Sequence, residues 1–278
     1  MNPVVPTPKE LLSALLPFLK VAGAYAQQIQ KRIAIHPDKY DGDHLFANAL
    51  TDADLSIQTF IEVVLLAKFP NLRFYGEEYE QSFNTKYFRA IDLGPQGDYL
   101  ITFVNADGFE AAIALSPANN KYYYSLRNQG TFVGSMDDDL DQCHPLKIDH
   151  PAPKIVLGTA LSPFADKIRE GLLTTLDSPD PVIDLKTAYS SETPVPPING
   201  LLTGEVAGSI LASAQFIDTA ALAWMASEMG YQLTTYDGKP TAAPANCENY
   251  RQSEIIVSAN EALQNKLVEI MKSIQHTS

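Results

Sequence analysis

The feature that most constrains the fold is a run of short apolar segments, separated by turn residues, in the middle of the chain. Segments 87–92, 100–104, 109–115 and 122–126 have the length and the β-branched and aromatic content of β-strands. Gly-Pro, Asp-Gly and Asn-Asn pairs stand between them, as in tight connections. Because connections this short join antiparallel strands, the pattern predicts an antiparallel sheet.

Two helices are predicted before this sheet. Residues 7–10 read Thr-Pro-Lys-Glu, a capping box with proline at the first helical position, and leucines at helical spacing follow. Pro17 is expected to kink or split this helix, since proline removes a backbone donor and its ring crowds the preceding turn. A second helix is predicted to begin at 51–54 and to end before Pro70.

The last part of the chain predicts alternating strands and helices. Residues 135–153 are polar and contain several prolines, which suggests a boundary between subdomains 1–150 and 151–278. Beyond it we expect strands at 154–161, 182–185, 232–236 and 253–258, and helices at 163–176, at 218–229 and after Asn260. This alternation is typical of βαβ units.

Composition excludes several classes of function. The chain has 278 residues with 20 Lys and Arg against 33 Asp and Glu, a formal net charge of −13. No basic run is present to hold nucleic-acid phosphates or an anionic membrane, so we expect no nucleic acid and no membrane as partners. Cys143 and Cys247 are far apart and form no disulfide framework, which favours a cytoplasmic location.

Carboxylates at the ends of predicted elements are the candidates for chemistry. Asp54 lies at a helix start, Glu77 follows a glycine, Asp92 ends a strand and Asp218 opens a helix. Such oxygens suit Mg²⁺, which prefers hard ligands and keeps some of its waters. Each acid also has a structural interpretation, as a helix cap, a solvated turn or an Asx-turn.

The order of these motifs resembles the inositol monophosphatase family of Mg²⁺-dependent, lithium-sensitive phosphatases. The resemblance runs through nearly the whole chain and is weakest at 135–215. Four stretches carry it: Thr-Asp-Ala-Asp at 51–54; Phe-Pro at 69–70 with Gly-Glu-Glu at 76–78; Asp-Thr-Ala-Ala at 218–221 with Glu-Met-Gly at 228–230; and Asp-Gly-Lys-Pro at 237–240 with the strand at 255–260.

This resemblance implies a fold, a cofactor and residue roles. The fold would be α+β, a layered αβαβα sandwich of the inositol monophosphatase and fructose bisphosphatase type. The 1–150 subdomain would carry most of the metal-site acids, and 151–278 would contribute Asp218. Glu77, Asp92 and Asp218 would bind two or three Mg²⁺ ions, and Asp54 would help Glu77 to orient the attacking water. The substrate would be a small phosphorylated metabolite, and the family's frequent pairing allows a homodimer.

The chain departs from the family at its central motif, Asp-Pro-x-Asp-Gly-Thr. Residues 92–98 read Asp-Leu-Gly-Pro-Gln-Gly-Asp, so Pro95 stands where the second Asp is expected and Gly97 where the Thr is expected. The loop is also longer than in the family, which could bring Asp98 in as a substitute metal ligand. Loss of one preorganised contact typically lowers an enzyme's rate by about 10²–10³-fold.

Two hypotheses about function follow from this sequence. The first is Mg²⁺-dependent hydrolysis of an inositol or sugar phosphate by a metal-activated water. The second is a catalytically impaired or inactive relative that binds a ligand or regulates a partner, because a fold can outlast its activity. We prefer the first hypothesis, since the four acids of the family motifs are all present.

Overall fold

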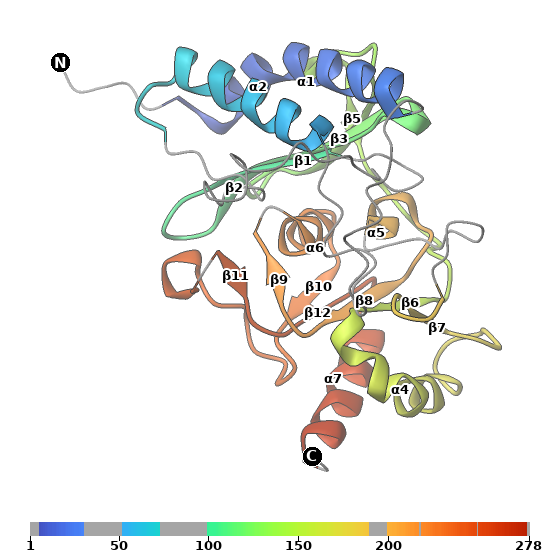
Figure 1. Ribbon diagram of the computed structural model, residues 1–278. Coiled ribbons are helices and arrows are strands. Elements are labelled where there is room, and N and C mark those ends of the chain that lie inside the picture. The colour runs from blue at the N-terminus through green and yellow to red at the C-terminus, as the bar shows by residue number, and fades with distance from the viewer. Residues whose placement is uncertain are drawn as a thin grey trace. The chain divides into compact units, whose positions relative to one another are not determined.

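The computed structural model describes residues 6–30, 52–72, 99–188, 199–216, 218–248 and 250–276 (Figure 1). Residue contacts divide the chain into two compact units. The first unit comprises Met1–Ile101, Ile113–Tyr123 and Val133–His144, and the second comprises Thr102–Ala112, Tyr124–Phe132 and Pro145–Ser278. The expected boundary at residue 150 stays a prediction.

The first unit begins with two helices that pack against each other, α1 (Pro8–Gln30) and α2 (Asp52–Lys68). The capping box forms as expected, with Glu10 accepting from the Thr7 backbone N–H at 2.7 Å and Thr7 accepting from the Glu10 N–H at 3.3 Å. Burial follows the predicted stripe of Leu11, Leu12, Leu15, Leu16, Leu19 and Ala22. None of the described helices is both long and apolar enough to cross a bilayer.

Pro17 does not split α1, which continues through it as one helix of 23 residues. The proline lies on the exposed side of the helix, two residues from the buried Leu15 and Leu19. Burying the leucine stripe offsets the backbone hydrogen bond that proline removes. The sequence predicted that Pro17 would either kink or split the helix, and the second outcome is therefore excluded.

One sheet runs in the order β1-β2-β3-β4-β5, and all five strands contribute residues to both units. Their bounds are β1 (Tyr99–Val104), β2 (Phe109–Ser116), β3 (Lys121–Leu126), β4 (Gly130–Ser135) and β5 (His144–Pro145). Three of the predicted strands are present, and their short connections make neighbouring strands antiparallel. The predicted strand at 87–92 lies outside the described residues. Strand β4 was not expected, because its two glycines and terminal serine give a weak strand pattern.

The second unit contains a five-stranded sheet in the order β10-β12-β8-β6-β7. The strands are β6 (Ile155–Leu157), β7 (Val182–Asp184), β8 (Gly208–Leu211), β10 (Gln232–Thr234) and β12 (Ile255–Ser258). β6 pairs in parallel with β7 and β8, while β12 pairs antiparallel with β8 and β10. A second, two-stranded sheet joins β9 (Ala214–Gln215) and β11 (Arg251–Gln252). The expected βαβ alternation is present, and the sheet is mixed.

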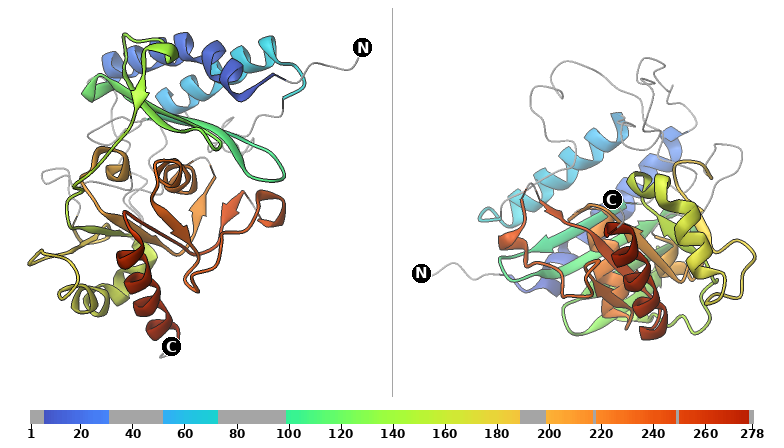
Figure 2. Two further views of the ribbon diagram at one scale, coloured as in Figure 1. Left: turned by 180° about the vertical axis from the view of Figure 1, so that it is seen from behind. Right: turned by 90° about the horizontal axis from the view of Figure 1, so that it is seen from below.

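Helices lie against both faces of this sheet (Figures 1 and 2). On one face, α4 (Ala165–Leu172) and α7 (Glu261–Gln275) bury Ile168, Leu267 and Met271 against Ile155 and Ile256 of the strands. On the other face lie α5 (Gly200–Thr203) and α6 (Thr219–Glu228). Coverage on both sides explains why β6 and β12 are runs of apolar residues and do not alternate with polar ones.

The start of α7 is fixed by side-chain hydrogen bonds. Asn260 caps the helix as predicted, accepting from the Leu263 N–H at 2.9 Å. One turn later, buried Gln264 accepts from Ser258 at 2.7 Å and donates to Thr234 at 2.7 Å. These contacts tie the helix to β12 and β10, so they fix its position along the sheet.

Two glycines of the second unit should differ in how much their replacement by alanine changes the stability of the protein. A Cβ on Gly208 of β8 would lie 2.6 Å from the backbone oxygen of Val257, whereas one on Gly171 of α4 would meet the end of the Ile270 side chain at 2.7 Å. Sheet backbone cannot yield, so we expect Gly208→Ala to lower the free energy of unfolding by about 1–3 kcal/mol. Ile270 can change rotamer, and alanine favours a helix, so Gly171→Ala should stay within about 1 kcal/mol. Urea denaturation of both variants measures the difference, and equal losses would contradict this account.

Two buried tyrosines should make stability fall at alkaline pH. The hydroxyls of Tyr231 and Tyr236 find no hydrogen-bond partner in the described part of the chain. Burial raises the pKa of Tyr231 to about 12, and burial together with the nearby Glu254 raises the pKa of Tyr236 further. A raised pKa in the folded state means that this stability is complete below about pH 10, the pKa of an exposed tyrosine, and is lost as pH rises through the folded values.

We therefore expect a double Tyr231→Phe, Tyr236→Phe variant to unfold less readily than the unmodified protein above pH 10. At pH 7 the variant should be about as stable, because no hydrogen bond to either hydroxyl is lost. Tyr250→Phe is the matched control, since Tyr250 is exposed and should leave the alkaline loss unchanged. Thermal unfolding from pH 7 to 12 measures all three, and an unchanged alkaline loss in the double variant would contradict the expectation.

Candidate functional site

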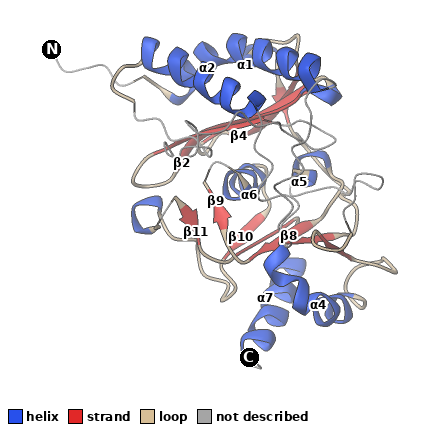
Figure 3. Cartoon of the chain, in the orientation of Figure 1, coloured by secondary structure: helices blue, strands red, loops and turns tan. Residues whose placement is uncertain are grey.

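Asp218 is the candidate metal ligand that the structure describes most fully. Figure 3 labels β9 and α6, two consecutive elements of the second unit. Asp218 lies between them in the sequence, at the N-cap position of α6, as the sequence predicted. Its carboxylate nevertheless accepts no capping hydrogen bond from the helix, and its backbone has φ −142° and ψ −111°. Asp218 therefore occupies the N-cap position without the side-chain hydrogen bond that a capping aspartate makes.

Helix α6 holds Asp218 in place through its own burial. All seven residues from Ala220 to Ala226 are buried, so the helix is covered on every side. Thr131 donates to the carbonyl of Met225 at 2.6 Å, and Trp224 stacks on Phe109 with ring centroids 5.4 Å apart. Trp224 is therefore a core residue, as expected. The aspartate sits at the positive end of the helix dipole, where a carboxylate is favoured.

The other candidate acids are described only in part. Asp54 lies in the first turn of α2, where the sequence predicted a helix start. Glu77, Asp92 and Asp98 lie outside the described residues, as does the altered 92–98 motif. Within the described ranges, no three His, Cys, Asp or Glu side chains gather closely enough to hold a metal ion. The grouping of these acids into one site thus stays a prediction.

The structure adds one buried carboxylate that the sequence reasoning did not single out. Asp184 ends β7 with 4% of its surface exposed. It accepts from the Ser162 hydroxyl at 2.6 Å and from the Lys186 backbone N–H at 3.0 Å. Both bonds tie the loops that follow β6 and β7, at the carboxyl ends of two parallel strands. The only sequence signal is an aspartate after a short apolar run, which many strand ends share.

Both cysteines are free, as the sequence indicated. Cys143 has a raised pKa because of burial, and so has Cys247. A thiol with a raised pKa is less nucleophilic at neutral pH. Neither cysteine is therefore a candidate nucleophile.

Solved structures resemble this chain along most of its length. An IMPase from Thermotoga maritima matches with a TM-score of 0.61 at 14% identity, covering 94% of this chain and 96% of its own. The extragenic suppressor protein SuhB from Bartonella henselae matches with a TM-score of 0.59 at 16% identity, covering 94% and 98%. An IMPase/NADP phosphatase complexed with Mg²⁺ and phosphate matches with a TM-score of 0.58 at 16% identity, covering 92% of each chain.

The chain has the inositol monophosphatase fold. This confirms the α+β fold class that the sequence motifs implied. Comparison of the sequence with protein-family models finds no match, and comparison with curated proteins finds none either. At 14–16% identity these likenesses establish the fold and leave the activity to be argued from residues.

Proposed function

We propose that this protein is a Mg²⁺-dependent phosphatase that hydrolyses a small phosphomonoester, of the inositol phosphate or sugar phosphate type. One observation carries the proposal: a chain with the inositol monophosphatase fold keeps an aspartate, Asp218, at the start of a buried helix. The sequence resemblance assigns a metal ligand to this same position.

The proposed ligands suit magnesium by their chemistry. Glu77, Asp92 and Asp218 offer only carboxylate oxygens, with Asp98 as the substitute for the missing second aspartate of the central motif. Mg²⁺ selects oxygen ligands and retains waters, whereas a site for zinc would include nitrogen or sulfur. When bound, such ions neutralise phosphate charge and lower the pKa of a coordinated water.

The remaining work falls to groups of the protein. In this proposal Glu77 and Asp54 accept hydrogen bonds from the attacking water. These hydrogen bonds aim the water at phosphorus, and the carboxylates take up its proton. Asp218 is held by α6, and fixed geometry of this kind is what makes a catalytic contact effective. Gly97 cannot replace the side-chain hydroxyl of a threonine, so we propose turnover slower than that of relatives with the complete motif.

A substrate panel tests this proposal. Inositol, sugar and nucleotide monophosphates and bisphosphates are each incubated with the full chain, with Mg²⁺ or with a chelator, and released phosphate is measured. We expect release from at least one compound with Mg²⁺ and none with the chelator. Asp218→Asn should lower that rate by about 10²-fold or more, because an amide oxygen is a neutral and weaker ligand.

The matched control is Asp177→Asn, which changes an exposed aspartate of the same unit. Asp177 lies between α4 and β7, and the variant should release phosphate at the unmodified rate. No phosphate from any compound at saturating Mg²⁺ would overturn the proposal and favour the non-catalytic hypothesis.

A further inference from the structure

The segment that leads into Asp218 is held from two sides, and both contacts lie within the second unit. The Phe216 N–H donates to the Tyr250 carbonyl at 2.9 Å, and the Phe216 carbonyl accepts from the Thr102 hydroxyl at 3.3 Å. The Asp218 N–H closes a turn by donating to the Gln215 carbonyl at 3.2 Å. Phe216 therefore lies inside this turn with both of its backbone groups engaged, and it limits how far Asp218 can move.

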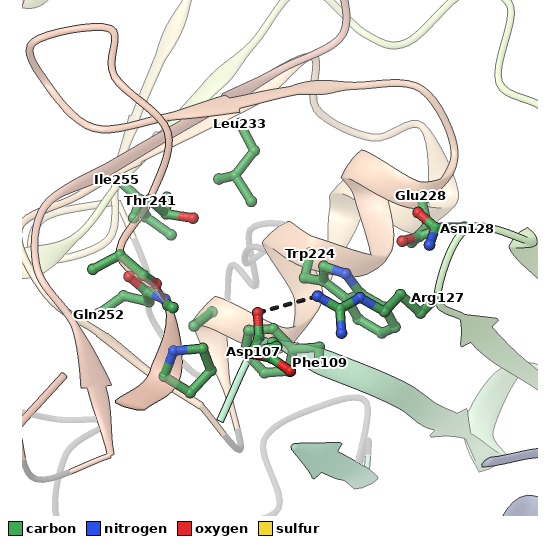
Figure 4. A pocket seen from close by; sticks show the side chains of 15 residues that line it. Asp107, Phe109, Arg127, Asn128, Trp224, Glu228, Leu233, Thr241, Gln252 and Ile255 are labelled. Carbon is green, nitrogen blue, oxygen red and sulfur yellow. Dashed lines mark hydrogen bonds between the residues drawn. The ribbon is translucent and has the colours of Figure 1, made fainter. Parts of the chain in front are cut away.

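The ring of Phe216 adds a third contact to these two. Phe216 is buried, and its ring meets that of Phe109 edge-on, with the ring centroids 5.6 Å apart. Phe109 in turn stacks on Trp224 of α6, and Figure 4 shows these two rings together in the wall of a pocket. Phe216 is thereby joined through Phe109 to the same helix that begins after Asp218.

The contact with Tyr250 comes from an unusual backbone conformation. Tyr250 has φ +55°, in the left-handed region that a bulky residue seldom adopts because its Cβ crowds the backbone. The Arg251 N–H closes the turn around Tyr250 by donating to the Glu248 carbonyl at 3.0 Å, and β11 follows directly, paired with β9. Such a conformation costs free energy and persists only where surrounding contacts fix it. The chain thus accepts strain at the turn whose carbonyl holds Phe216.

Thr102 makes its contact through a side chain, so a substitution can remove that contact. It lies on β1, four residues after Asp98 in the sequence. Its hydroxyl donates a hydrogen bond, whereas the equally branched side chain of valine has no donor. Small displacements of a group in a catalytic site matter, since an error of about 1 Å can lower a rate about 10²-fold. Loss of the Thr102 hydrogen bond should therefore loosen the turn that ends at Asp218.

We propose that Thr102 is a positioning residue, which fixes the Asp218 carboxylate for a metal ion by holding the carbonyl of Phe216. The inference rests on the proposed function in one respect, that Asp218 is a Mg²⁺ ligand. Thr102 acts through Phe216 and touches neither the ion nor the substrate. Removing a group that orients a metal ligand typically lowers metal affinity or activity about 10–100-fold.

Calorimetric titration of Mg²⁺ into the metal-free full chain tests this role, because it measures binding without any turnover. We expect saturable binding to the unmodified protein and a dissociation constant about tenfold or more higher for Thr102→Val. Thr102→Ser keeps the hydroxyl and should restore most of the affinity. In the Asp218→Asn background, Thr102→Val should add no further loss, because the hydroxyl acts through that carboxylate. Thermal unfolding checks that each variant is folded, and Thr102→Ala carries the same expectation if valine disturbs the strand.

Thr234→Val is the matched control, since it removes a threonine hydroxyl from another strand of the same unit. That hydroxyl donates to the Thr235 carbonyl at 2.9 Å and accepts from Gln264 at 2.7 Å. Its loss should lower the unfolding temperature and leave Mg²⁺ binding unchanged. The inference is overturned if folded Thr102→Val binds Mg²⁺ as tightly as the unmodified protein, if it adds a further loss to Asp218→Asn, or if the unmodified protein shows no saturable binding.

Phosphate release from the best compound of the panel separates this inference from the proposed function. Mg²⁺ binding that is weakened in Thr102→Val, together with no phosphate release by the unmodified protein, would overturn the phosphatase function alone. Phosphate release by the unmodified protein, together with unchanged Mg²⁺ binding in Thr102→Val, would overturn the positioning role alone.

Discussion

Replacing Glu77 by glutamine should lower Mg²⁺-dependent phosphate release by about 10²–10³-fold, the largest effect on activity that we expect of one substitution. The resemblance gives Glu77 two tasks: it binds a metal ion and it contacts the attacking water. Glutamine keeps the size of the side chain, but it carries no charge and its nitrogen cannot bind a cation. The turnover number should fall while the variant unfolds at the same temperature as the unmodified protein.

Glu80→Gln is the matched control, since it makes the same change three residues along the chain. Its rate should equal that of the unmodified protein. Equal rates in Glu77→Gln and Glu80→Gln would show that Glu77 plays no part in the chemistry. Equal and large losses in both would point to a general effect of charge in this segment.

Leu267→Ala should have the largest effect on stability, lowering the free energy of unfolding by about 2–5 kcal/mol. Leu267 lies on α7 with none of its surface exposed, inside the cluster that joins α4 and α7 to the sheet of the second unit. Alanine would leave a cavity there. Its neighbours are held by the strand register and by the Gln264 hydrogen bonds, so they can close the gap only in part.

Glu269→Ala on the same helix is the control for that measurement. Glu269 is exposed and its contact with Lys266, at 3.3 Å, is a surface ion pair worth little. Urea denaturation should show a change within about 0.5 kcal/mol for this variant. Similar losses in both variants would mean that α7 is not held by its apolar face.

Local sequence signals predicted the elements that depend on local chemistry. The capping box at 7–10 and the cap at Asn260 marked helix starts, because a side-chain oxygen that satisfies a backbone N–H acts within one turn. Turn residues likewise marked the ends of the predicted strands, because a turn depends on a few neighbouring residues. Strand β4 and the shortening of the expected strand at 154–161 to β6 depend on pairing with distant strands, which no local pattern encodes.

The candidate site was predicted from the order of motifs, and it stays a prediction. Asp218 takes the expected position at the start of α6, and the absence of a capping bond was not visible in the sequence. Asp184 was missed because its hydrogen bonds come from loops after two different strands.

We propose that this chain uses carboxylate-bound Mg²⁺ to hydrolyse a phosphomonoester. The most direct measurement is the rate of phosphate release by the unmodified full chain, from the best compound of the panel, as Mg²⁺ is titrated in after removal of all metal. We predict a rate that rises from zero and saturates, at or below the usual range of about 1–10³ s⁻¹. A rate that is zero at every Mg²⁺ concentration, or that is unchanged by removal of metal, would contradict the claim.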